Sequence, residues 1–169
     1  MRIDTVASRV TPTRPGHGFS LIELLVVVAI MSILASIGLP LAELAHKRTQ
    51  EEDLRRSLRE IRNALDAYKR LVDTGRIARA ADASGYPPRL QVLVDGVPDA
   101  QSPQGTLLYL LRRLPRDPLA SDTVTEAADT WTPRSYTSSA DDPQPGRDVF
   151  DVHSKSAGIG MDGVPYRKW

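Results

Sequence analysis

An apolar run from Phe19 to Ala42 constrains this chain more than any other feature, because it carries a single charge, Glu23. A helix of its 24 residues would measure about 36 Å, which exceeds the ~30 Å hydrocarbon core of a bilayer. A carboxylate near one end of a membrane helix costs free energy. The run therefore predicts a membrane-spanning helix whose one charge needs a compensating partner.

A chain start next to this run would supply such a partner. If the chain is cut between Gly18 and Phe19, the new α-amine lies four residues before Glu23, and its pKa near 8 leaves it largely cationic. Helices packed side by side could then place the amine of one subunit against the carboxylate of the next. We interpret Glu23 as an assembly residue.

The residues around this cut carry a resemblance to a known family. Gly18 before Phe19, Glu23 as the fifth residue of the mature chain and the run FSLIELLVV resemble the class III leader of type IV pilins and type II secretion pseudopilins. The resemblance implies that a prepilin peptidase cleaves after Gly18 and methylates the Phe19 amine. It also implies that the mature helix packs in a filament core and that Pro40 kinks it.

Two other interpretations of the N-terminus stay open. The run could be the apolar region of an ordinary signal peptide, cut after Gly38. It could also be a plain single-span anchor with an uncut tail. The mature N-terminus separates the three, because they predict a start at methylated Phe19, at Leu39 and at Met1.

Charge and cysteine content limit the partners and the compartment. The net charge is +1 (22 basic minus 21 acidic residues), and removing residues 1–18, with three arginines and one aspartate, leaves −1 (19 minus 20). A near-neutral chain gives no case for nucleic acid as a partner. The basic leader favours a cytoplasmic N-terminus, a single pass through the inner membrane and a periplasmic remainder. The absence of cysteine excludes disulfides and thiolate chemistry.

The pattern of apolar and charged residues along the sequence divides the chain into four parts. Residues 1–18 form a cytoplasmic leader, 19–42 the transmembrane and filament-core helix, 43–73 its amphipathic extension and 74–169 a globular domain. The extension is predicted from an apolar stripe at steps of three and four residues, formed by Leu54, Leu58, Ile61, Leu65, Tyr68 and Val72. On its charged faces Glu51 lies four residues before Arg55, a spacing typical of a solvated ion pair.

The C-terminal part predicts an α+β, pilin-like fold. The leucines of 106–114 indicate a short helix closed by Pro115, whereas 90–95 fits a helix or a strand. Trp131, Tyr136 and the alternation at 150–153 predict two or three antiparallel strands. The order of these segments, with Asp162-Gly163 near the end, is similar to the major pseudopilin of type II secretion.

That similarity implies calcium in the C-terminal loop, for which Asp148, Asp151 and Asp162 supply the carboxylates. The paired acids expected before the last tryptophan are instead Arg167 and Lys168. This change favours a chain without a cofactor, in which the aspartates bind the backbone of their own turns.

The sequence indicates a structural subunit rather than an enzyme. His153 and Ser154 are neighbours on a predicted strand, so they point to opposite faces and cannot act as base and nucleophile. The resemblance implies a subunit of a type II secretion pseudopilus. Its partners would be copies of itself, other pseudopilins, prepilin peptidase, the inner-membrane assembly platform and lipid. A minor type IV pilin and a membrane-anchored domain that does not polymerise are the alternatives.

Overall fold

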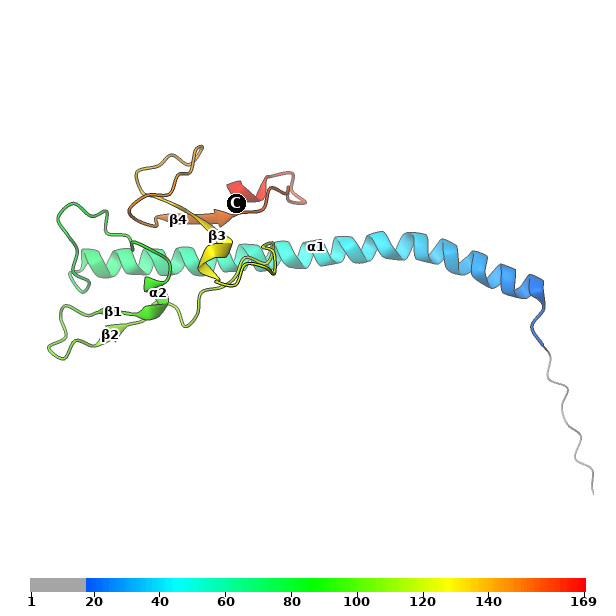
Figure 1. The fold of residues 1–169 in the computed structure, drawn as a ribbon, viewed down its shortest axis with the longest axis horizontal. Coiled ribbons are helices and arrows are strands. Elements are labelled where there is room, and N and C mark those ends of the chain that lie inside the picture. The colour runs from blue at the N-terminus through cyan, green and yellow to red at the C-terminus, as the bar shows by residue number, and fades with distance from the viewer. Residues whose placement is uncertain (1–17) are drawn as a thin grey trace, which may run out of the picture. The chain divides into compact units, whose positions relative to one another are not determined.

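The computed structural model describes residues 18–169, apart from the side chains of residues 37–39. The predicted leader therefore lies outside the described residues except for Gly18. The chain divides into two compact units, one ending at Glu43 and the other comprising Leu44–Trp169. One helix, α1 (Leu21–Asp73), contributes to both units and is drawn from blue to green in Figure 1.

In the first unit, α1 exposes its apolar side chains. Leu21, Ile22, Leu24 and Leu25 are each more than half exposed. By length and composition this part of α1 could cross a membrane, and so long an apolar surface needs lipid or other chains to cover it. The helix continues through Pro40.

In the second unit, α1 supplies one side of the core. The predicted stripe is confirmed, because all six of its side chains are buried: Leu54, Leu58, Ile61, Leu65, Tyr68 and Val72. The helix ends at Asp73, and Gly75 follows it with φ of 72°. Glycine tolerates this left-handed conformation, which lets the chain leave the helix.

A small hairpin follows α1 in the second unit. It comprises α2 (Val92–Asp95), β1 (Val97–Pro98) and β2 (Leu107–Leu108), and the two strands are antiparallel. The predicted helix over 106–114 is wrong. The N–H groups of Leu110 and Leu111 both donate to the carbonyl of Leu93, so this leucine-rich segment pairs with distant backbone instead of with its own preceding turn.

A second antiparallel sheet carries the last part of the core. Strands β3 (Trp131–Arg134) and β4 (Asp151–Ser154) pair with Trp131 opposite Ser154, and the short helices η1 (Ala128–Thr130) and η2 (Tyr166–Lys168) flank them. Figure 1 shows this sheet and the β1–β2 hairpin on opposite sides of the second half of α1. A long helix with small antiparallel sheets confirms the predicted α+β, pilin-like architecture.

Candidate functional site

Glu23 lies in the first turn of α1 and takes part in a capping box with Ser20. The backbone N–H of Glu23 donates to Ser20 Oγ (3.2 Å), and the backbone N–H of Ser20 donates to Glu23 Oε2 (3.5 Å). These reciprocal bonds satisfy two N–H groups that a helix start leaves without partners. Glu23 therefore has a local structural role, which the Ser-x-x-Glu spacing of Ser20 and Glu23 could have indicated.

The capping box does not need a charge. Glutamine serves at the third helical position of such a box as well as glutamate, and the helix dipole contributes only about 0.3–1 kcal/mol for an acidic group in the first turn. The side chains that follow Glu23 are apolar and exposed. The local structure thus explains the shape and hydrogen bonding at position 23, whereas the negative charge still lacks a partner within the described chain.

The predicted cleavage point precedes this helix. Gly18 and Phe19 are both exposed and precede the first helical turn, so a peptidase could reach the bond between them. A Cβ atom added at Gly18 would meet nothing within 4 Å, and Gly18 has no positive φ. The fold of the described chain therefore does not require glycine at this position.

The polar side chains inside the apolar half of α1 are satisfied by the helix itself. Ser32 Oγ donates to the carbonyl of Val28 (2.8 Å), and Ser36 Oγ donates to the carbonyl of Ile33 (2.7 Å). Such bonds to the preceding turn are typical of serine in membrane helices. Glu23 is therefore the polar group in this half of the helix that calls for an external partner.

The comparisons with known proteins single out the same segment. Residues 14–39 match the family model of the prokaryotic N-terminal methylation motif. No curated protein and no solved structure matches the chain significantly. This match is confined to the N-terminal segment. It supports the type IV pilin-like superfamily and suggests a structural subunit that prepilin peptidase processes, and the apolar helix is consistent with membrane anchoring.

The three aspartates proposed for calcium bind separate groups of the protein. Asp151 accepts from Arg62 Nε (2.8 Å) and from Arg134 Nη2 (3.3 Å). Asp162 Oδ2 pairs with Arg55 (2.6 Å), while its Oδ1 accepts the Val164 N–H (2.9 Å). Both carboxylates are thus already neutralised by arginines.

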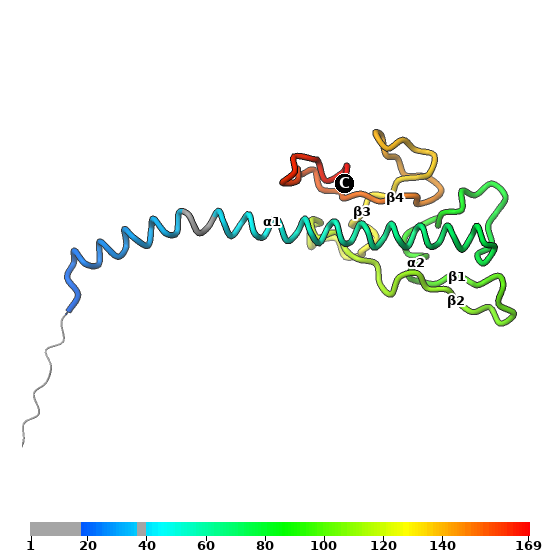
Figure 2. The backbone as a smooth tube through the Cα atoms, turned by 180° about the vertical axis from the view of Figure 1, so that it is seen from behind, coloured from blue at the N-terminus to red at the C-terminus, as the bar shows by residue number. Residues whose placement is uncertain are grey.

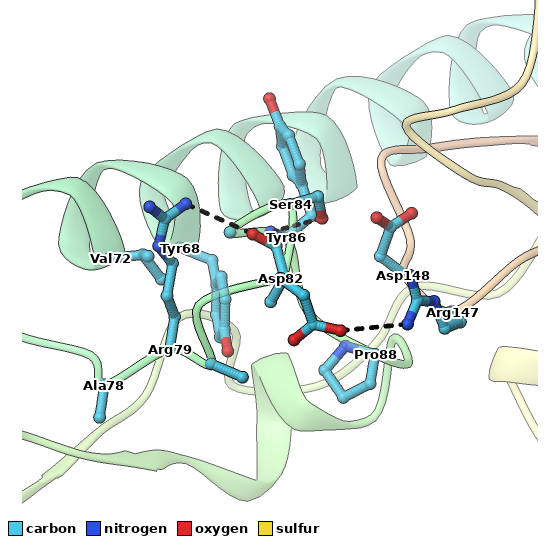
Figure 3. A pocket seen from close by; sticks show the side chains of 13 residues that line it. Tyr68, Val72, Ala78, Arg79, Asp82, Ser84, Tyr86, Pro88, Arg147 and Asp148 are labelled. Carbon is cyan, nitrogen blue, oxygen red and sulfur yellow. Dashed lines mark hydrogen bonds and ion pairs between the residues drawn. The ribbon is translucent and has the colours of Figure 1, made fainter.

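Asp148 lies in a different setting. It accepts hydrogen bonds from Ser135 Oγ (2.8 Å) and from the Tyr136 N–H (2.9 Å). Burial alone would raise the pKa of Asp148, but hydrogen bonds from Ser84, Tyr136 and Ser135 outweigh it and hold the pKa below its usual value. Its carboxylate borders a cavity of about 310 Å³, seen in Figure 3 beside the Asp82–Arg147 ion pair.

These positions do not fit one calcium ion. Asp162 borders another cavity, lined by residues of α1 and Trp169, and no cluster of three acidic or histidine side chains suited to a metal occurs within residues 18–169. Calcium takes six to eight oxygen ligands, whereas each of these aspartates already binds arginine, hydroxyl or backbone groups through one or both of its oxygens. Calcium binding stays a prediction that no contact of these residues supports.

The residues considered for catalysis are also held in other contacts. Ser154 Oγ is buried and donates to Asp117 Oδ2 (2.6 Å), while His153 Nδ1 lies 3.1 Å from the carbonyl oxygen of Ser154. The serine hydroxyl is therefore bonded to a carboxylate and not to the imidazole. This arrangement serves the packing of β4 and differs from that of a nucleophile and its base.

The structure also reveals a site that sequence analysis missed, where the C-terminal segment meets α1. Glu51 is only 7% exposed, and its Oε1 accepts the Met161 N–H and the Tyr166 hydroxyl, both at 2.9 Å. Arg55 pairs with Asp162. The predicted solvated pair between Glu51 and Arg55 is therefore wrong, because residues more than 100 positions away take both side chains.

The hydrogen bond to Glu51 predicts a pH dependence. Burial, together with the bond to Glu51, raises the pKa of Tyr166 to about 12, whereas an unfolded tyrosine titrates near 10. The native state thus keeps the proton longer, so this contribution to stability is complete below about pH 10 and disappears as the pH rises towards 12. Burial also raises the pKa of Tyr68 and of Tyr86, so titration of the tyrosines by ultraviolet absorbance should show several late-titrating groups. Tyr166→Phe should remove one of these late-titrating groups. If Tyr166→Phe removes only an early-titrating group, this assignment is incorrect.

Proposed function

We propose that this chain is a subunit of a type II secretion pseudopilus, which polymerises through its N-terminal helix to drive protein export across the outer membrane. The observation that carries the proposal is the charge of Glu23 at the start of an exposed apolar helix, within a matched methylation motif. The capping box accounts for the hydrogen bonds of this side chain but not for its charge. A neighbouring chain start supplies the missing cation.

In this proposal each N-terminal residue has a distinct role. Cleavage after Gly18 creates the Phe19 amine, which is methylated and remains cationic. Glu23 of one subunit neutralises that amine on the next, so that neither charge is buried alone. The exposed side chains of the apolar half of α1 cover one another in the filament. Pro40 donates no N–H to the helix, which weakens the ladder of hydrogen bonds there when the helix leaves the lipid.

Gly18 gives the proposal independent support. Its backbone conformation and its surroundings would accept a larger side chain, so nothing in the described chain accounts for glycine there. Recognition by an external enzyme does account for it, because a peptidase that cleaves after this residue must bring its own catalytic groups close to the backbone. Glycine permits such an approach.

The proposal predicts the mature N-terminus. Mass spectrometry of protein purified from its natural host should show a chain that begins at methylated Phe19. Gly18→Val should leave the leader attached, because a branched side chain blocks the approach to the bond. Gly16→Val, the same change two residues earlier, is the matched control and should be processed. A start at Leu39 or at Met1 in the unaltered protein would exclude the proposal.

A further inference from the structure

Residues 159–169 lie along one face of α1 and are here called the C-terminal clasp. Figure 2 shows this segment, in red, beside the second half of the helix. Four helix residues hold it, and they recur at intervals of four, four and seven positions, which places them on the same face. They are Lys47, Glu51, Arg55 and Arg62.

Arg55 contacts both the turn at Asp162 and the last residue of the clasp, Trp169. Its Nη2 lies 2.6 Å from Asp162 Oδ2, and its guanidinium carbon lies 4.0 Å from the centre of the Trp169 ring. The ring also meets Tyr166 edge-on, with centroids 5.0 Å apart. The indole N–H has no hydrogen-bond partner in the described residues, so stacking rather than hydrogen bonding holds this ring.

The remaining contacts fix the backbone of the clasp. Lys47 Nζ donates to the carbonyl of Ile159 (3.0 Å), and Arg62 Nη2 donates to the backbone oxygen of Trp169 (2.6 Å). A Cβ atom at Gly160 would clash with the Trp169 ring and lie 2.6 Å from Asp162 Oδ1. The turn is therefore packed closely around the carboxylate of Asp162.

We propose that Arg55 acts as the cation of this turn, so that side chains of α1 fasten the clasp and no divalent metal is needed. The guanidinium neutralises Asp162 on one side, while the Val164 N–H binds the other carboxylate oxygen. A calcium ion at Asp162 would have to displace Arg55 from the carboxylate and from the ring. Arg167 and Lys168 in the same segment would add repulsion.

Hydrogen exchange of the full-length protein in detergent micelles tests this proposal. Arg55→Gln keeps much of the side-chain length but removes the charge and the planar cation. From the typical strengths of a partly exposed ion pair and of a cation–π contact, we expect exchange in residues 159–169 to become about 5- to 30-fold faster. Arg70→Gln removes an exposed arginine of the same helix away from the clasp and is the matched control. It should leave the exchange of the clasp unchanged.

Peptides from β3 and β4 report whether each variant is folded. Their exchange should be the same in all three proteins, because the effect of Arg55→Gln is local. Unchanged exchange of the clasp in Arg55→Gln would overturn the proposal. So would an effect of equal size in Arg70→Gln, since the faster exchange would then follow the loss of any positive charge on the helix rather than of this contact.

A second arm uses the unaltered protein with calcium chloride or with a chelator. Exchange of the clasp should be the same in both solutions. Slower exchange in calcium, reversed by the chelator, would show that a metal fastens the segment and would refute the proposal. None of these readouts depends on cleavage, methylation or polymerisation, so their failure is distinguishable from a failure of the proposed pseudopilin function.

Discussion

Glu23→Gln should leave the protein in the membrane and abolish its assembly into filaments. Glutamine can keep the hydrogen bond of the capping box, so the start of α1 should form normally. The Phe19 amine of the next subunit would then be buried without a counter-charge, and breaking a buried ion pair in this way costs about 3–5 kcal/mol. Subunit association should weaken by about two to four orders of magnitude. Recovery of sheared filaments, together with secretion of exoproteins into the medium, measures the effect.

Two variants separate the charge of Glu23 from its other roles. Ser20→Ala removes one hydrogen bond of the capping box but keeps the charge, and it should still assemble. Glu43→Gln neutralises another exposed acid of the same helix and should also assemble. Normal filaments in Glu23→Gln, or their loss in Ser20→Ala alone, would mean that the capping box rather than the charge explains this residue. If Glu23→Gln instead abolishes motility or DNA uptake while secretion stays intact, the result would favour a subunit of a type IV pilus over a subunit of a secretion pseudopilus.

Asp117→Ala should cost the second unit about 3 kcal/mol of unfolding free energy. The carboxylate is 1% exposed and accepts from Ser154 Oγ (2.6 Å) and from the Leu119 N–H (2.8 Å). Its removal leaves the buried Ser154 hydroxyl and the partly buried Leu119 N–H without this acceptor, and each unsatisfied buried group costs about 1–3 kcal/mol. Trp131 lies close to this site, because its indole N–H donates to the carbonyl of Pro115, two residues before Asp117. Tryptophan fluorescence during urea unfolding in micelles should therefore report the loss.

Matched variants test whether the hydrogen bonds of Asp117 cause this effect. Asp117→Asn keeps an acceptor and lets the Ser154 hydroxyl rotate, so it should cost clearly less than the alanine variant. Asp129→Ala removes an exposed carboxylate from the same segment between β2 and β3. This change should leave the free energy of unfolding close to that of the unaltered protein. Equal losses for Asp117→Ala and Asp129→Ala would contradict a specific role of the buried carboxylate.

The regular elements of this fold follow from local patterns. The long apolar run and the stripe from Leu54 to Val72 predict α1, because burial along one face requires a 3.6-residue period. The alternation around Val152 predicts β4 for the same kind of reason. The structure of residues 106–114 cannot be predicted in this way. The spacing of their leucines is typical of a helix, but the backbone N–H groups of Leu110 and Leu111 donate to the distant carbonyl of Leu93.

The candidate sites show the same division. The position of Glu23 and the cleavage motif can be recognised from neighbouring residues alone. The partners of Glu51 and Arg55 cannot, because an i,i+4 pair on a helix looks solvated until a remote segment covers it. Asp148, Asp151 and Asp162 resemble a metal site in sequence, but only tertiary packing shows that arginines neutralise the last two.

Arg62 connects three segments that lie far apart in the chain. Its Nε donates to the Asp151 carboxylate of β4, and its Nη2 donates to the backbone oxygens of Val152 and Trp169. Arg62 thus adds a polar connection from α1 to the sheet and to the clasp, beside the contacts that Glu51 and Arg55 make with the clasp. A force applied along the helix would reach β4 and Trp169 through this guanidinium group as well as through the hydrophobic core.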